Sequence, residues 1–289
     1  MSKAALLILK KESGVTSFAS LSSVKRYFKG EKVGHAGTLD KFASGLMLVL
    51  VGRATKLNPL FSSLDKTYIA TVRFGIETDT LDPEGEVIKT GHIPTREEVD
   101  AVLPSFLGRQ EQIPPVYSAL HVNGKRAYEL ARSGKDVEMQ SREINIYSIK
   151  LLDFKGDEAK IELRVSKGTY IRSFARDLGS RLNTCASLSA LVRTTIGPYS
   201  FSDESDFESA VDKTIPQLLK MDTIDKVNIL KDSIKKLQNG LVPYHFTDDK
   251  MIKDGYYLAL YDDHLIAILD KCGKKISIVA QGEAFDAGL

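Results

Sequence analysis

A strict alternation of apolar and polar side chains runs from residue 66 to residue 75. The apolar positions share one face of an extended chain, and they are Tyr68, Ala70, Val72 and Phe74. A period of two residues is typical of a strand with one buried face, and a strand is stable only beside other strands. The sequence therefore predicts a sheet that contains this segment.

Other segments complete a mixed pattern. Strands are predicted at 4–9, 116–122, 144–154, 159–166, 256–260, 265–269 and 276–280. Helical spacing predicts a helix that buries Phe18, Leu21, Val24 and Phe28, and further helices at 95–107 and 169–182. The segment 33–40 is predicted as a glycine-containing loop, followed by a compact apolar element at 43–50. Because strands outnumber helices and do not alternate regularly with them, the predicted fold class is α+β.

The last part of the chain differs in composition. Residues 201–232 hold eight acidic and four basic side chains, within acidic segments predicted as helical, and short strands dominate after residue 240. We therefore predict a main domain at 1–235 and a small β-rich module at 236–289. Residues 1–60 carry the opposite charge, +7 net, which favours a polyanionic ligand, although a solvated lysine-rich surface explains the charge equally well.

Several classes of protein are disfavoured. The two cysteines, Cys185 and Cys272, form no Cys-x-x-Cys pair, and the five histidines are scattered, so no metal site is expected. The longest apolar run is far shorter than the roughly 20 residues that cross a bilayer, and no secretion signal is visible. We expect a cytoplasmic protein without a cofactor and without contact with a membrane.

One loop contains a carboxylate that is a candidate catalytic residue. The segment 34–45 places Asp40 between glycines and an apolar element, where the backbone can approach a ligand closely. From the residue types alone, the simpler interpretation is that Asp40 caps a following helix. The segment has neither the Gly-x-x-x-x-Gly-Lys-Ser/Thr motif of a phosphate-binding loop nor the Gly-x-Ser-x-Gly motif of a nucleophilic serine.

At this loop the sequence resembles a known family, the bacterial tRNA pseudouridine-55 synthases. The matches cover roughly residues 5 to 200 in the family's order: Gly34-His35-Ala36-Gly37-Thr38-Leu39-Asp40, Ala43-Ser44-Gly45, Gly52-Arg53-Ala54-Thr55-Lys56, Asp65-Lys66-Thr67-Tyr68, Gly75-Ile76-Glu77-Thr78-Asp79-Thr80, the segment 112–120 and Ser166-Lys167-Gly168-Thr169-Tyr170-Ile171-Arg172. Chance coincidence of so many ordered motifs is very improbable. The resemblance implies a pseudouridine synthase fold with a mixed, mainly antiparallel central sheet flanked by helices.

The resemblance also implies an isomerase that converts a uridine in the T-loop of tRNA to pseudouridine. Asp40 matches the family's catalytic aspartate, which attacks the target nucleoside. Arg172 matches the arginine that pairs with this aspartate, and Tyr68 matches the active-site tyrosine that stacks on the flipped base. From the residue types alone, Arg172 is also explained as an exposed residue of a helix, and Tyr68 is also explained as a core residue of the alternating strand.

Further residues are assigned by the same resemblance to binding of RNA. Leu191 and Tyr170 match residues that line the uracil pocket, and His35 matches a histidine that enters the T-loop where the nucleotide has left. A basic surface for RNA phosphates is implied on the first helix, at Lys25, Arg26, Lys29 and Lys32. The module at 236–289 is similar in place and size to PUA-like domains that bind the acceptor stem.

The sequence departs from the family pattern at three places. The usual Lys-Pro after the first strand is Lys10-Lys11, the proline after the catalytic aspartate is Lys41, and the usual Leu-Arg-Arg is Leu191-Val192-Arg193. The departures put affinity for RNA in question more than the chemistry, since each residue implied in catalysis is present.

Two alternatives stay open. The chain could act as a tRNA-folding chaperone, either as its only function or in addition to catalysis, and that role needs the RNA surface but not Asp40. It could also modify ribosomal RNA or another position of tRNA by the same chemistry. The expected partner in the leading interpretation is tRNA, bound by a monomer.

Overall fold

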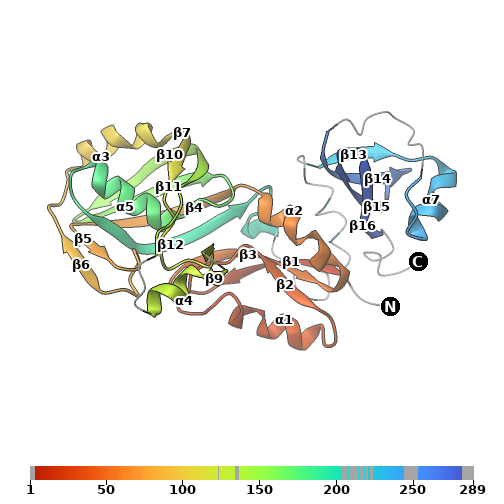
Figure 1. The fold of residues 1–289 in the computed structure, drawn as a ribbon, viewed down its shortest axis with the longest axis horizontal. Helices are drawn as coiled ribbons and strands as arrows, with labels where there is room; N and C mark the ends of the chain where they lie inside the picture. Colours follow the sequence, from red (N-terminus) through yellow and green to blue (C-terminus); the bar gives the residue numbers. More distant parts are fainter. Residues whose placement is uncertain are drawn as a thin grey trace.

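The computed structural model describes residues 4–122, 124–133, 137–203, 207, 214, 218, 221, 224–243 and 253–281. An eight-stranded sheet forms the centre of the larger lobe (Figure 1). Its strands follow the order β1-β3-β12-β4-β11-β10-β7, and β2 pairs with β3 beside this path. The bounds are β1 Ala5–Lys11, β2 Val33–Ala36, β3 Ser44–Val51, β4 Lys66–Phe74, β7 Gly108–Gln112, β10 Arg142–Lys155, β11 Glu158–Val165 and β12 Ala186–Ile196.

The pairing in this sheet confirms the predicted mixed, mainly antiparallel arrangement. Only β3 and β12 run parallel, and they pair over two residues of each strand. β1 occupies the whole of one edge of β3, so β12 and β2 share the other edge. The chain between β2 and β3 therefore leaves the sheet near the point where β12 diverges from β3, and this loop carries Asp40.

Both faces of the sheet are buried at its β1–β3 end. Alternate residues of β3 enter two different cores, Met47 and Val49 on one face and Leu46 and Leu48 on the other. This explains why β3 is a continuous apolar run rather than an alternating one. In β4, which has one half-exposed face, the alternation is preserved and its predicted buried positions are confirmed.

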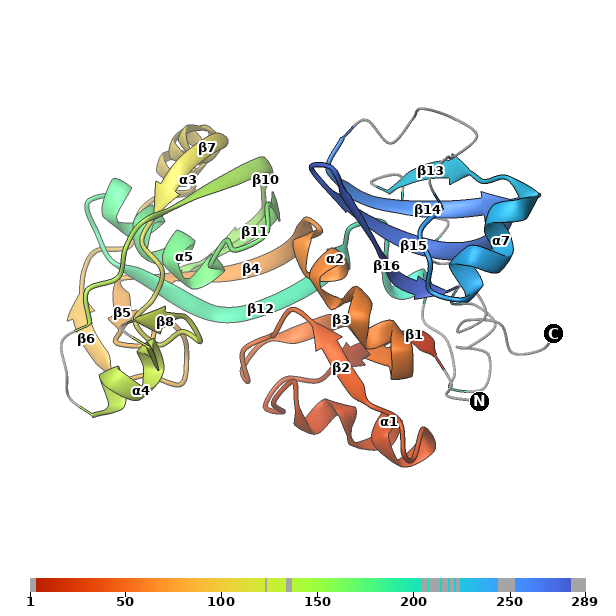
Figure 2. The same cartoon turned by 45° about the vertical axis from the view of Figure 1, so that its right-hand side comes forward.

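Helices cover the sheet. α5 and α3 lie on one side of the larger lobe, and α2 lies on the side of the smaller lobe (Figures 1 and 2). Thr95 and Glu98 form a capping box at the start of α3, within the segment predicted as a helix at 95–107. No helix in the described parts is long and apolar enough to cross a bilayer. The helices are α1 Ser22–Tyr27, α2 Asn58–Ser63, α3 Arg96–Val102, α4 Ala127–Arg132, α5 Ile171–Arg181 and α7 Lys231–Gln238, with short 3-10 segments at Ala19–Leu21, Gly52–Leu57, Leu103–Phe106 and Phe201–Asp203.

A second sheet of four strands forms the smaller lobe (Figure 2). Leu258, Leu260 and Leu265 from this sheet join the same apolar cluster as Leu46 and Leu48 of the central sheet, so the two lobes share a core. The division at residue 236 stays a prediction; β13 and the start of α7 precede it. The strands are β13 Asp225–Asn228, β14 Gly255–Tyr261, β15 His264–Cys272 and β16 Lys275–Gln281.

Two small hairpins stand apart from these sheets. They are β5 Ile76–Thr78 with β6 Val87–Thr90, and β8 His121–Val122 with β9 Lys125–Arg126. The strand predicted at 116–122 is therefore wrong except for its last two residues. Its backbone turns towards the interior instead, where the carbonyl group of Tyr117 accepts a hydrogen bond from Arg172.

Two other predictions need correction. Residues 33–36 form a strand, because β3 has a free edge there that β2 completes. Phe18 does not join the core: its exposed fraction is 72%, and the ammonium group of Lys25 lies 3.6 Å from its ring centroid. The other positions of the predicted stripe, Leu21, Val24 and Phe28, are buried as expected. Half of the acidic stretch 201–232, which was predicted to contain helical segments, lies outside the described residues, and its described half includes a strand at Asp225–Asn228.

Candidate active site

A cavity of about 1050 Å³ lies where β12 and β3 diverge. Its walls come from the loop between β2 and β3, from β4 and β12, from the turn at 79–86, from residues 117–119 and from the start of α5. The predicted site residues that line this one cavity are Asp40, Tyr68, Tyr170, Arg172 and Leu191. Residues that are up to 151 positions apart in the sequence therefore face the same space.

The loop that carries Asp40 is fixed at both ends. On its N-terminal side, the buried hydroxyl group of Ser17 accepts a hydrogen bond from the backbone N–H of Leu39 (3.0 Å) and donates one to the carbonyl group of Leu39 (2.9 Å). On its C-terminal side, Gly45 has φ +118°, and a Cβ atom there would lie 2.3 Å from the carbonyl oxygen of Arg193. Only glycine fits this close approach of β3 to β12.

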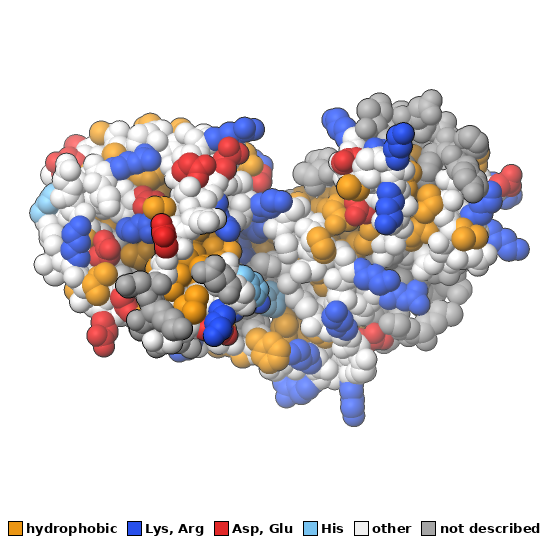
Figure 3. All heavy atoms as spheres, viewed as in Figure 1, with side chains coloured by type: hydrophobic (Ala, Val, Ile, Leu, Met, Phe, Trp, Pro, Cys, Tyr) orange, Lys and Arg blue, Asp and Glu red, His pale blue; other side chains and the backbone are white. Residues whose placement is uncertain are grey.

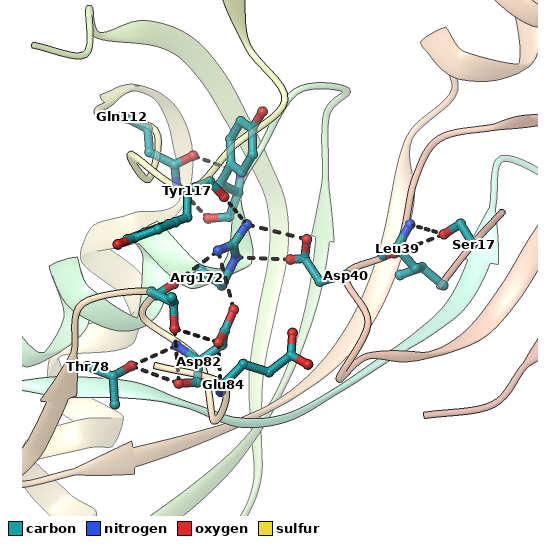
Figure 4. Close-up of polar contacts among 11 residues, drawn as sticks. Ser17, Leu39, Asp40, Thr78, Asp82, Glu84, Gln112, Tyr117 and Arg172 are labelled. Carbon is teal, nitrogen blue, oxygen red and sulfur yellow. Dashed lines mark hydrogen bonds and ion pairs between the residues drawn. The ribbon is translucent and has the colours of Figure 1, made fainter. Parts of the chain in front are cut away.

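Asp40 does not cap a helix. The element that follows it is the strand β3, so the simpler interpretation of this aspartate is wrong. Its carboxylate faces Arg172 instead (Figure 4). The Nε atom of Arg172 lies 2.9 Å from one carboxylate oxygen, and a terminal nitrogen lies 3.4 Å from the other. This two-point contact fixes the orientation of the carboxylate.

Arg172 has three further partners around its guanidinium group. It lies in the first turn of α5, its side chain is 6% exposed, and its terminal nitrogens donate to the carbonyl groups of Thr80 (3.0 Å) and Tyr117 (2.9 Å). The carboxylate of Asp82 lies 3.3 Å away. Thr80 and the backbone N–H of Glu84 in turn donate to the other oxygen of Asp82. The guanidinium group is thus held rigidly from three segments of the chain.

Two carboxylates share this one positive charge. Asp82 is buried, with 5% of its side chain exposed, whereas 39% of the Asp40 side chain is exposed to the cavity. Burial raises the pKa of Asp40 above its ordinary value; Arg172 opposes this shift, and the charges of Asp82 and Glu84 add to it. Because Asp82 already balances Arg172 in the interior, Asp40 retains a carboxylate that can react.

Part of the remaining wall of the cavity is aromatic and apolar. Tyr68 and Leu191 are both buried at the cavity surface. The side chain of Gln112 holds the backbone of Tyr170 by two hydrogen bonds, of 2.8 and 3.0 Å. Burial raises the pKa of the Tyr170 hydroxyl group, so this ring remains neutral. These side chains offer flat apolar surfaces in the same cavity as the carboxylate of Asp40.

Other predicted residues lie outside the cavity lining. His35 is half-buried on β2, two residues before Gly37, and burial lowers the pKa of its imidazole. Arg26, Lys29 and Lys32 are exposed on α1 and the segment after it, while Lys25 packs over Phe18. Lysine and arginine side chains project along the lower edge of the molecule, where α1 lies in Figure 1 (Figure 3).

Three lining residues were not singled out from the sequence. Asp82 follows the motif 75–80 by two residues, and a buried arginine needs such a partner. Lys66 and Arg193 also line the cavity, and burial lowers the pKa of Lys66 to about 8. Among the residues described here, no cluster of His, Cys, Asp and Glu side chains could hold a metal ion.

Comparison with solved structures defines the fold class. The chain in a structure titled "Structure of H/ACA RNP bound to a substrate RNA containing 2'-deoxyuridine" is 20% identical, with a TM-score of 0.66 over 96% of this chain and 84% of that one. A chain of a Cbf5-Nop10-Gar1 complex gives 21% identity and a TM-score of 0.65, over 98% and 87%. Because these similarities extend over nearly the whole chain, the central sheet and the additional C-terminal sheet together form an α+β fold that is shared with these solved structures.

Sequence comparison then identifies the family. Residues 25–171 match the family described as "TruB family pseudouridylate synthase (N terminal domain)". A protein of Borreliella burgdorferi (strain ZS7) named tRNA pseudouridine synthase B is 42% identical over 92% of this chain and 95% of its own length. A protein of the same name from Francisella philomiragia is 41% identical, over 94% and 93%. The chain belongs to the TruB family of pseudouridylate synthases.

Proposed function

We propose that the chain isomerises uridine 55 in the T-loop of tRNA to pseudouridine, with Asp40 as the nucleophile. The observation that carries the assignment of Asp40 is its partly exposed carboxylate, which Arg172 holds at the wall of a cavity large enough for a nucleotide. The substrate follows from family membership, because relatives that match this chain almost end to end are tRNA pseudouridine synthases.

The reaction replaces the bond between the ribose and N1 of the uracil with a bond between the ribose and C5. The C1′–N1 bond of the uridine breaks, the uracil turns within the cavity, a C1′–C5 bond forms, C5 loses its proton and N1 gains one. An ionised Asp40 can attack either C6 of the base or C1′ of the ribose, or remove a proton from the sugar on a path through a glycal, and each path needs a carboxylate oriented towards the nucleoside. Tyr68, which lines the same cavity, would stack on the uracil and take part in proton transfer.

The target base must leave its stack before it reaches Asp40. Extrusion of a nucleotide costs a few kcal/mol, which contacts in the protein have to offset. Tyr68, Tyr170 and Leu191 would supply the flat and apolar contacts to the detached uracil. His35, beside the cavity mouth on β2, would enter the space that the nucleotide leaves in the T-loop.

We assign RNA binding to two parts of the molecule. The cations on α1 and on the segment after it, Lys25, Arg26, Lys29 and Lys32, would contact phosphates of the T-stem. The C-terminal β-rich part, at 236–289 in the division of the sequence, would act as a PUA-like module on the acceptor stem. Its shared core with the central sheet supports a fixed distance between the two contacts.

The enzyme would act as a cytoplasmic monomer that needs no cofactor. One chain supplies Asp40, Tyr68 and Arg172 to a single cavity, so a second copy is not required to complete the site. The atoms gained and lost in the isomerisation balance within the nucleoside, so no co-substrate is consumed. A cytoplasmic location follows from that of the substrate.

The test is conversion of a T-loop stem-loop RNA by the wild-type protein and by Asp40→Asn. We expect pseudouridine at position 55 from the wild type, and a rate at least about 10⁴-fold lower from the variant, with binding of RNA changed only a few-fold. An RNA with cytidine at that position is the negative control. Normal conversion by Asp40→Asn would refute the role of Asp40, and absence of product from the wild type would refute the proposed activity.

The same variant separates catalysis from chaperone action. If Asp40→Asn binds tRNA and accelerates its folding as well as the wild type does, the protein has both roles. A wild-type protein that folds tRNA but leaves uridine 55 unchanged would establish the chaperone alone. Mapping of pseudouridine over whole tRNA and ribosomal RNA decides whether other positions are substrates.

A further inference from the structure

Lys41 directly follows the proposed nucleophile and lies at the edge of the cavity. Its side chain is 55% exposed, and its ammonium group lies 3.2 Å from a carboxylate oxygen of Glu84, whose side chain is 42% exposed. Both residues line the cavity. The side chain of Glu84 extends towards the loop that carries Asp40 (Figure 4). The ion pair therefore joins this loop to the turn 79–86 at the solvent-exposed edge of the cavity.

The backbone of Lys41 is fixed, whereas its side chain is held weakly. The carbonyl group of Lys41 accepts hydrogen bonds from the backbone N–H of Gly14 (2.9 Å) and from the ammonium group of Lys11 (3.2 Å). Among the described residues, Glu84 is the only ion-pair partner of the Lys41 side chain. An exposed ion pair contributes little to stability, so Lys41 can exchange this partner for another anion without a large change in the free energy of unfolding.

The other cations that line the cavity are already bonded within the protein. In the described part of the wall they are Lys66, Arg172 and Arg193, and each of them is buried. Each also donates hydrogen bonds to backbone carbonyl groups. Lys41 is therefore the one exposed cation that the described wall of the cavity offers to a ligand.

The turn that pairs with Lys41 is acidic. Asp79, Glu84 and Glu86 are exposed on this turn, and all three line the cavity. RNA is a polyanion, so a phosphate beside this turn is repelled unless a cation binds it there. A nucleotide with its base or ribose against Asp40 has a phosphate on each side of the ribose. The residue that follows Asp40 in the chain is well placed to meet one of them.

We propose that Lys41 is a substrate-binding residue: when RNA binds, its ammonium group leaves Glu84 and contacts a backbone phosphate next to the target nucleotide. The proposal rests on the proposed function, in which this nucleotide enters the cavity at Asp40. The family pattern has proline at this position, which carries no charge, so the contact is a property of this chain. Glu84 opposes binding, because it holds Lys41 in the free protein and competes with the phosphate.

The first experiment measures single-turnover conversion of T-loop RNA at increasing concentrations of the full-length protein, at one pH at which Asp40 is ionised. We expect Lys41→Met to raise the half-saturating concentration about 3- to 10-fold and to change the saturating rate less than about twofold. The slope of log affinity against log salt concentration should decrease in magnitude by about 0.7, the value for one phosphate contact of a single strand. Lys41→Arg keeps the charge and should restore both quantities. An unchanged half-saturating concentration and salt slope in Lys41→Met would overturn the proposal.

Changes at Glu84 distinguish contact with RNA from neutralisation of the turn. We expect Glu84→Gln to lower the half-saturating concentration about 2- to 5-fold, the equivalent of one exposed ion pair, because Lys41 no longer has to leave a partner. When Lys41→Met is added to Glu84→Gln, it should weaken binding at least as much as it does in the wild type. If Lys41→Met has no effect in the Glu84→Gln protein, Lys41 only neutralises Glu84, and the proposal is overturned.

The matched control is Lys10→Met. Lys10 is an exposed lysine that also pairs with a glutamate, Glu12, at 3.9 Å, and neither residue lines the cavity. We expect Lys10→Met to leave the half-saturating concentration and the salt slope nearly unchanged. Equal losses in Lys10→Met and Lys41→Met would show a general effect of net charge and would overturn the specific contact.

Equilibrium binding of the same RNA, with each change introduced into Asp40→Asn, makes the result independent of conversion. Weaker binding on addition of Lys41→Met supports the contact even if the wild type converts no uridine, an outcome that contradicts only the proposed function. Unchanged binding on addition of Lys41→Met, together with normal conversion by the wild type, overturns only the contact. A wild type that does not bind T-loop RNA overturns both.

Discussion

The loop at Asp40 and the turn at Asp82 are stabilised by the same arrangement of two hydrogen bonds. In each, one buried hydroxyl group accepts from the N–H and donates to the C=O of a single residue: Ser17 does this for Leu39, and Thr78 does it for Asp82 (Figure 4). Each region then presents one carboxylate to the same guanidinium group of Arg172. The two regions differ in what surrounds the carboxylate.

The two carboxylates differ in the exposed fraction of their side chains: Asp40 is partly exposed and can react, whereas Asp82 is buried and supports the structure. Asp82 has no access to the cavity comparable to that of Asp40, and its oxygens are used by Arg172, Thr80 and Glu84. Asp40 has Arg172 as its only side-chain partner in the described structure, and its exposed part faces the cavity. The comparison predicts that changes at Asp82 lower stability as well as rate, whereas changes at Asp40 act mainly on rate and alter stability only through its dependence on pH.

Replacement of the shared partner should have the largest effect. Arg172→Met leaves Asp82 buried without a counter-charge, and loss of one partner of a buried pair costs about 3–5 kcal/mol in the free energy of unfolding. We also expect a loss of roughly 10³-fold in single-turnover rate, because Asp40 loses its orientation. Chemical denaturation and conversion of T-loop RNA measure the two effects.

Arg176→Met is a suitable control for this variant, since Arg176 lies on the same helix and pairs with the neighbouring Asp177. We expect little change in rate from it. A folded Arg172→Met protein with wild-type stability would show that Asp82 does not depend on the guanidinium group.

Removal of the buried carboxylate comes second. Asp82→Asn retains an oxygen that can accept from Thr80 and Glu84, but it weakens the contact with Arg172. We expect a loss of about 1–3 kcal/mol in the free energy of unfolding and a decrease of about tenfold in rate. Because the charge of Asp82 raises the pKa of Asp40, the acidic limb of the pH–rate profile should also move to lower pH in Asp82→Asn. A limb that moves to higher pH would contradict this account of the shared charge.

The pH dependence of the wild type gives a smaller effect. Burial raises the pKa of Asp40, and activity needs the ionised form, so the rate should decline at a pH above the ordinary aspartate value of about 4. The folded state then binds this proton more tightly than the unfolded state, so Asp40 contributes a stability that decreases as pH rises through the same window. Asp40→Asn should lack this decrease. Equal pH profiles of stability in the two proteins would contradict it.

How much of this could be predicted from the sequence differs between the two regions. Asp40 stands in a motif with glycines on both sides, and the close approach at Gly45 explains why a glycine is needed there. Local patterns also predicted β4, the β10–β11 pair and α5, since each depends on side chains that repeat along one segment. Asp82 has no such signal. Its role depends on an arginine 90 residues away in the sequence.

The errors have a common physical cause. The strand predicted at 116–122 is an irregular segment because the carbonyl group of Tyr117 binds Arg172, and the loop predicted at 33–36 is a strand because β3 has a free edge. In both cases a partner from a distant part of the chain outweighs the local preference. Phe18 has the spacing of a core residue, but the helix begins later than the pattern indicates.

The buried hydroxyl groups of Ser17 and Thr78 provide a further comparison of the two regions, with the smallest of the expected effects. Ser17→Ala and Thr78→Val each leave one buried N–H and one C=O group without their partner, so each should lower the free energy of unfolding by about 1–3 kcal/mol. The effects on rate should differ. Ser17→Ala frees the residue next to Asp40 and should reduce the rate several-fold at saturating RNA, whereas Thr78→Val acts on a turn that Arg172 still holds through Thr80 and Asp82. Equal losses of rate in both variants would show that the Asp82 turn positions the nucleophile as directly as its own loop does.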